Sequence, residues 1–236
     1  MRKYVLTDKA GSTAERLRVT AGKFAHAAAP DSDETLTRIT AEGHDSPLLA
    51  ALEAPGPADP EARLFVLNTH AVTKDPKEPQ AYTVVKEIPA PAVSLEQKLI
   101  FGISAICKIY KNAEFGHWAK NWLSGRNRSM ETARAIKESL KKEALAAGAL
   151  EALAAWGETA GRDEETVHEH GDAEKRALHI AAAAELAARP EADADEVAGA
   201  IAMATRGIDR YRDKVDLVDL AEKVAGDRSS PIHKHN

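Results

Sequence analysis

The side chains with the clearest potential for chemistry lie between Trp118 and Ser129. Trp118 and Trp122 are four residues apart, which places them on one face of a helix. A Ser-Gly turn follows, and Arg126 and Arg128 come directly before a helix start at Ser129. A helix N-terminus offers unpaired amides and partial positive charge, and arginines add fixed donors, so this segment has the means to hold a phosphate or a partner's carboxylate. These five residues are the candidate binding residues.

The same segment also has a purely structural interpretation. In that interpretation Trp118 and Trp122 anchor the core, Ser124-Gly125 ends a helix, and Ser129 is an N-cap. An arginine would then lie over a tryptophan ring. The sequence leaves both interpretations open.

Histidines and acids near residue 170 are of the types that bind metal ions. His168, His170 and Asp172 alternate along a polar stretch, and His179 follows. Alternating histidines in a loop share no fixed face, and the sole cysteine is remote. We interpret the stretch as a solvated loop and predict no metal site.

The common catalytic and nucleotide-binding motifs give no support for an enzyme. Gly-x-Ser-x-Gly, Ser-x-x-Lys and an activated cysteine do not appear in a strand–turn–helix setting. Gly-x-Gly-x-x-Gly and the Walker A loop are absent. We predict no catalytic residues and no cofactor, although catalytic groups can assemble from distant positions, which keeps an enzyme with an unrecognised site as an alternative.

Charge is unevenly distributed along the 236 residues. Residues 1–107 carry 12 basic and 14 acidic side chains, residues 108–142 carry 9 and 3, and residues 143–236 carry 11 and 20. The basic region 108–142 could follow nucleic acid phosphates, but the acidic remainder would repel a polyanion. Lys137, Lys141 and Lys142 lie beside Glu138 and are typical of a solvated helix face. The acidic region 143–236 suits a basic protein partner.

The first 93 residues are predicted to form a small α+β region. Strands are expected at Lys3–Thr7, Arg63–Val72 and Tyr82–Ile88, the last two as a hairpin over about 63–88, which together make a short antiparallel sheet. A capping box at residues 12–15 predicts a helix to about Ala29. Ser46-Pro47 predicts a short helix through Glu53.

Pro89-Ala-Pro91 marks the predicted boundary of an alanine-rich helical domain over 94–226, which a flexible tail, 227–236, follows. The predicted helices are 95–110, 114–123, 129–147 with a stop at Gly148, 149–156, 173–189, 195–211 and 216–225, with a loop over 158–171. Aromatic residues make up only 5% of the chain, so aliphatic side chains and alanine must fill the interior. The expected fold class is mainly α, with a C-terminal helical bundle.

The sequence also predicts a cytoplasmic protein. Cys107 has no second cysteine to pair with, which suits a reducing compartment. The start of the chain lacks the apolar region of a signal peptide. The longest apolar run is far shorter than the ~20 residues of a membrane helix, so no membrane partner is expected.

The pattern Trp118-Ala-x-x-Trp122-Leu-Ser-Gly-x-x-Arg128-Ser129, followed by alanine-rich helix, resembles a bacterial family of immunity proteins. The resemblance covers about residues 95–204, and residues 1–93 lie outside it. It implies an all-helical protein that protects a cell from a toxin, and it implies no particular site residues.

Three functions are compatible with these observations. The first is a non-enzymatic protein-binding module, of the immunity type, that inhibits a basic toxin. The second is a nucleic-acid-associated protein of a phage or mobile element that uses the basic region 108–142, with Arg126 and Arg128. The third is the enzyme with an unrecognised site.

Overall fold

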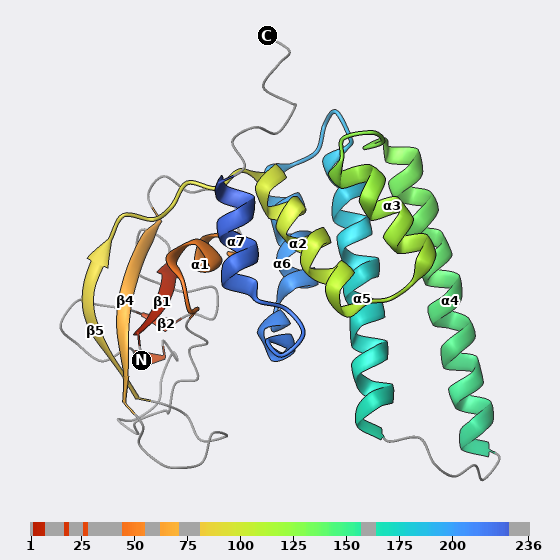
Figure 1. The fold of residues 1–236 in the computed structure, drawn as a ribbon, viewed down its shortest axis with the longest axis horizontal. Helices are drawn as coiled ribbons and strands as arrows, with labels where there is room; N and C mark the ends of the chain where they lie inside the picture. Colours follow the sequence, from red (N-terminus) through yellow and green to blue (C-terminus); the bar gives the residue numbers. More distant parts are fainter. Residues whose placement is uncertain are drawn as a thin grey trace. The chain divides into compact units, whose positions relative to one another are not determined.

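The computed structural model describes residues 2–7, 17–18, 26–27, 44–54, 62–70, 81–156 and 164–226. Contacts divide the chain into two units, Met1–Ser94 and Leu95–Asn236. The prediction of a mainly helical protein, with a short antiparallel sheet near the N-terminus and a C-terminal helical bundle, is confirmed (Figure 1). The predicted tail 227–236 lies outside the described residues.

The first unit is built on a three-stranded antiparallel sheet with the order β1-β4-β5. Strand β1 spans Arg2–Thr7, β4 spans Arg63–His70 and β5 spans Ala81–Ile88, close to the predicted strands. The central strand β4 buries four consecutive apolar side chains, from Leu64 to Leu67. At the start of β4, Arg63 forms a two-point ion pair with Glu87 of β5, with N–O distances of 3.0 and 2.6 Å.

The short helix α1, Pro47–Glu53, begins and ends where the sequence predicted. The Ser46 hydroxyl accepts a hydrogen bond from the Leu49 amide at 3.0 Å, and proline at the first position has no amide to satisfy. Just before α1, Asp45 forms an ion pair with Lys3 of β1 at 2.7 Å.

The helix predicted from the capping box to Ala29 is wrong where the structure describes that region. Two short strands, β2 (Leu17–Arg18) and β3 (His26–Ala27), pair antiparallel there. A capping box specifies only the first turn of a helix, and β-branched Val19 and Thr20 follow β2 in the sequence.

The second unit is a bundle of helices around α2. Its elements are α2 (Leu95–Ile109), α3 (Ala113–Leu123), α4 (Met130–Trp156), α5 (Glu164–Ala187), α6 (Ala194–Thr205), the 3-10 helix η1 (Ile208–Tyr211) and α7 (Leu217–Gly226). Helix α2 contacts α3, α5, α6 and α7, and it buries Phe101, Ile103 and Ile106 completely. Helices α4 and α5 run side by side and extend past the others (Figure 1).

Small residues bring the helices of the bundle close together. A Cβ added to Gly102 of α2 would lie 2.7 Å from Ile180 Cδ1 of α5 and 3.4 Å from Thr205 Cγ2 of α6. Helix α5 itself buries a series of alanines: Ala173, Ala177, Ala181, Ala183 and Ala184. Alanine therefore fills part of the interior, as the composition predicted, and small side chains allow the helices to approach closely.

Three predicted helix limits in the second unit are wrong. Gly148 does not stop a helix, because α4 continues to Trp156; the alanines and leucines around it outweigh the ~1 kcal/mol cost of one glycine. The predicted loop 158–171 is helical from Glu164, where two consecutive acids suit the positive end of a helix. The helix predicted over 195–211 ends at Thr205, because Gly207 adopts a φ of 66° and starts a new turn.

Candidate functional site

Both tryptophans of the candidate segment lie on the inner side of α3. The helix starts where the Asn112 side-chain oxygen accepts from the Phe115 amide at 2.9 Å. Trp118 and Trp122 are 6% and 4% exposed, and the Phe115 ring lies 5.4 Å from that of Trp118. The Trp118 indole nitrogen is buried without a hydrogen-bond partner among the described residues. Both side chains are thus core anchors, as the structural interpretation had it.

Arg128 is held by three contacts within the unit. Its guanidinium lies 4.4 Å above the Trp122 ring, and Nε donates to the Trp122 carbonyl oxygen at 2.9 Å. Nη1 donates to the Glu96 carboxylate of α2 at 2.7 Å. Arg128 therefore fastens the α3–α4 turn to α2, and its donors point into the protein.

Ser129 is the N-cap of α4, and the chain itself supplies acceptors for the amides at this helix start. The Ser129 hydroxyl accepts from the Thr132 amide at 3.3 Å, and Asn127 Oδ1 accepts from the Ser129 amide at 3.1 Å. The backbone amide of Glu131 and the Ser129 side chain both hydrogen-bond the Glu131 carboxylate and lower its pKa. An incoming anion would have to displace these groups.

Arg126 differs from the other four candidate residues. It follows Gly125, whose φ of 72° lets the chain leave α3, and its amide donates to the Asn121 carbonyl at 3.0 Å. The Arg126 side chain is exposed and has no ion-pair partner in the described part of the chain. Of the candidate binding residues it is the one that is open to an external ligand.

A buried carboxylate, which the sequence did not single out, joins α4 to α5. Glu185 of α5 is 3% exposed and accepts from Arg134 Nε at 2.9 Å and from Lys137 Nζ at 2.5 Å, both of α4. The hydrogen bond from Lys137 is the main reason that the pKa of Glu185 falls to about 2, against the effect of burial. Lys137 is thus not part of a merely solvated face, whereas Lys141 and Lys142 are exposed.

A second polar cluster ties α5 to the end of α6 and to η1. Arg176, which is 5% exposed, donates from Nε to Asp172 at 2.7 Å and from Nη1 to the Ala204 carbonyl at 3.0 Å. The Asp172 carboxylate also accepts from the Tyr211 hydroxyl at 3.0 Å and pairs with Arg210 at 2.8 Å. Burial opposes its ionisation, but Arg176 and these other partners outweigh burial and lower its pKa.

The spacing of Asp172 and Arg176, four residues apart, is the one signal in the sequence for this cluster. Arginine at that position covers carbonyls at the end of α6, which would otherwise lack donors. The cluster is therefore structural: it stabilises the break after α6.

The stretch with alternating histidines is placed in helix α5. His168 and His170 belong to its first turns, while Asp172 is already bound by arginines and Tyr211. Within the described ranges there is no group of three or more His, Cys, Asp or Glu side chains that could hold a metal ion.

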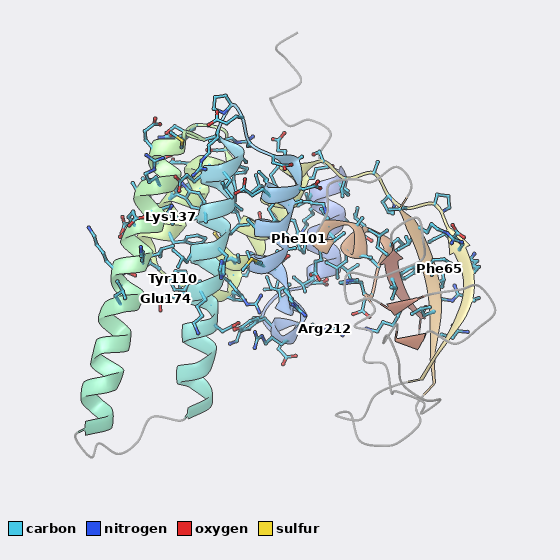
Figure 2. All side chains as sticks on the ribbon, turned by 180° about the vertical axis from the view of Figure 1, so that it is seen from behind. Phe65, Phe101, Tyr110, Lys137, Glu174 and Arg212 are labelled. Carbon is cyan, nitrogen blue, oxygen red and sulfur yellow. The ribbon has the colours of Figure 1, made fainter. Side chains whose placement is uncertain are left out.

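Tyr110 and Glu174 lie close together in Figure 2, at the junction of α2, α4 and α5. The Tyr110 hydroxyl donates to Glu143 at 3.4 Å, and Asn112 donates to the same carboxylate at 2.8 Å. Burial, together with the charges of Glu143 and Glu174, raises the pKa of Tyr110 to about 12. The phenol is therefore a neutral hydrogen-bond donor at physiological pH.

Two further ionisable side chains are largely enclosed on α2. Lys98 is 1% exposed, and burial lowers its pKa to about 8. Burial raises the pKa of Cys107 to about 11, although Lys111 and Lys108 oppose the shift. At neutral pH Cys107 is a protonated thiol, a poor nucleophile.

The acidic side chains around the start of α6 are exposed. Glu191, Asp193, Asp195 and Glu196 all lie on the surface, and residues 190–205 contain no lysine or arginine. Asp193 caps α6 by accepting from the Asp195 amide at 2.9 Å, and acids in a first turn also suit the helix dipole. Stabilisation of the helix start therefore explains the acids at positions 193, 195 and 196. It does not explain Glu191, which lies outside the helix.

Comparison with protein-family models, with curated proteins and with solved structures finds no match to this chain. None of the described helices has both the length and the apolar character that crossing a membrane requires. The class that the fold and these contacts define is therefore a mainly helical protein with a small N-terminal antiparallel sheet.

Proposed function

We propose that the helical unit is a non-enzymatic protein-binding module, of the immunity type, that covers a basic surface of a toxin in the cytoplasm. The observation that carries the proposal is the exposed acidic group Glu191, Asp193, Asp195 and Glu196, which no basic residue interrupts over 190–205. Segregated surface charge steers an oppositely charged partner and favours it over others.

The carboxylates that join the helices support a role for the outer surface of the unit, rather than for an internal catalytic site. Glu185 is bound by Arg134 and Lys137, and Asp172 is bound by Arg176 and Tyr211. Each of these groups holds two elements together, which leaves neither carboxylate available as an acid or base for a substrate. This pattern fits a scaffold that presents a surface.

The test is to co-express the protein with the product of the neighbouring gene and to measure their complex by calorimetry. Reversal of Glu191, Asp195 and Glu196 to lysine is expected to weaken the complex at least about tenfold, equivalent to 1.4 kcal/mol. Glu222→Lys, an exposed acid of α7, is the matched control and should have little effect. A complex that is indifferent to the triple reversal would contradict the proposal.

Exposed Arg126 favours a second candidate function, association with nucleic acid. Lys108, Lys111 and Lys120 are also exposed in this basic region. A nucleic-acid complex would weaken as salt rises, and Arg126→Glu would weaken it further. Arg128→Glu is unsuitable for this test because Arg128 holds Glu96 and Trp122. Salt-dependent binding of duplex DNA or RNA that Arg126→Glu reduces would favour this function over the first.

A further inference from the structure

We propose that the outward face of α6 is a docking surface for a basic amphipathic helix of the partner. This inference rests on the proposed function and assigns its contact surface. The outward face consists of Glu196, Gly199 and Met203, at spacings of three and four residues along α6.

The burial pattern of α6 defines this face. The opposite side of the helix is buried through Val197, Ala198, Ile201, Ala204 and Thr205, where α6 packs against α2 and α5. Helix α6 lies behind α2 in Figure 1 and on the near side of the helical unit in Figure 2. Its outward side chains thus point away from the described helices that α6 packs against.

Gly199 has no role in the packing of the described part of its unit. A Cβ at this position would find no atom within 4 Å, and its φ is not positive, so neither space nor backbone conformation requires glycine. Glycine inside a helix nevertheless costs about 1 kcal/mol relative to alanine. A flat site beside Ala200 would allow the backbone of another helix to approach closely, as Gly102 allows within the bundle.

Met203 supplies an apolar contact one helical turn beyond Gly199. Its side chain is 61% exposed, which makes it one of the three large hydrophobic residues, with Val85 and Leu145, that are exposed in the described ranges. Methionine is flexible and polarisable and adapts well to a partner's surface. Together Gly199 and Met203 form an apolar centre of about 6 Å along the helix.

The charges at one end of this centre specify the partner. Exposed Asp195 and Glu196 lie there, in the first turn of α6. Charge complementarity requires a helix with basic residues over the acidic end and apolar residues over Gly199 and Met203.

The defined probe is a synthetic helical peptide with leucines along one face and lysines elsewhere, labelled for fluorescence anisotropy at physiological salt. We expect it to bind, and we expect Gly199→Leu and Glu196→Lys each to weaken binding about tenfold. The matched control is Gly116→Leu on α3, where the added side chain also meets open space. This control should change affinity less than about twofold. Circular dichroism checks that every variant keeps its helix content.

Two further peptides separate docking from simple charge attraction. The twin peptide with glutamates in place of lysines should not bind, and oligolysine should bind much more weakly than the amphipathic helix. Any of three results would overturn the docking inference. These are equal binding of oligolysine and the amphipathic peptide, no binding of the amphipathic peptide, or an affinity for that peptide that Gly199→Leu leaves unchanged. A separate result would contradict the proposed function: the affinity of the complex with the natural partner would not change when the acidic group is reversed to lysine.

Discussion

Glu185 and Arg134 approach to 2.9 Å between α5 and α4, with the carboxylate almost fully buried. Because Lys137 binds the second carboxylate oxygen, Glu185 joins the two longest helices of the unit. Glu185→Gln should destabilise the protein by about 3 kcal/mol at pH 7, since three basic groups, Arg134, Lys137 and Arg189, lose their counter-charge. Urea unfolding measures the loss of stability, and Glu222→Gln, at an exposed position on α7, is the control.

The contribution of Glu185 to stability should decrease as the pH falls. Since the hydrogen bond from Lys137 lowers the folded-state pKa of Glu185 from 4.5 to about 2, its contribution to stability is complete above pH 4.5. The contribution is lost as the pH falls toward 2. The difference in unfolding free energy between wild type and Glu185→Gln should therefore shrink over this window. A constant difference from pH 7 to pH 2 would contradict the assignment.

Substitution of Arg176 should reduce the stability of the protein more than substitution of any other member of the second cluster. Arg176→Met leaves Asp172 and the Ala204 carbonyl in the last turn of α6 without their main donor, at a cost of about 3 kcal/mol. Tyr211→Phe removes one hydrogen bond to Asp172 and should cost about 1 kcal/mol. Denaturant midpoints would test this order. A larger loss for Tyr211→Phe would show that the hydroxyl, and not the arginine, holds η1.

Gly102 tests the close packing of α2 against α5. Gly102→Ala should destabilise by about 1–3 kcal/mol, because the new methyl would lie 2.7 Å from Ile180 Cδ1. Ile180→Val removes that atom, so the double variant should recover part of the loss. Gly116→Ala is the control and should be neutral or stabilising, because it adds helix propensity in open space. Additive effects of the two substitutions would contradict this contact.

The local elements were largely predictable because their signals lie within a few residues. Ser46-Pro47 determines α1 through a hydroxyl three residues from the amide that it caps. Glycines were harder to interpret: Gly125 ends a helix and Gly148 does not. The residues after each glycine make the difference. After Gly125 comes a polar turn in which Asn127 accepts from the Ser129 amide, whereas helix-forming residues come after Gly148.

The candidate site was predictable only in part, because its decisive contacts are distant in sequence. Spacing indicates that Trp118 and Trp122 share a face, and an interior location suits their size. Nothing in the sequence pairs Arg128 with Glu96, 32 residues earlier, or Lys137 with Glu185, 48 residues later. Those pairs depend on how the helices pack, and the first of them holds the Arg128 side chain against the protein.

Cys107 is expected to react slowly with alkylating agents. Burial raises its thiol pKa from 9.0 to about 11, which reduces the thiolate fraction at neutral pH about a hundredfold. Iodoacetamide labelling, followed by mass spectrometry, should be slow at pH 7.5 and should accelerate up to about pH 11. The urea-unfolded chain is the control and should react like a free cysteine. Equal rates for folded and unfolded protein would contradict the burial of this thiol.

Lys98 should add a pH-dependent contribution to stability at alkaline pH. Because burial lowers its folded-state pKa from 10.5 to about 8, Lys98 binds a proton more readily in the unfolded chain between these values, and its contribution to the free energy of unfolding rises with pH there. The raised thiol pKa of Cys107 opposes this rise above pH 9. The full shift of Lys98 corresponds to about 3 kcal/mol. Lys98→Met should remove this contribution, whereas Lys141→Met, at an exposed position on α4, should preserve it. Urea unfolding at pH 7, 9 and 10 measures the slope. The same slope in wild type and Lys98→Met would show that another group causes it.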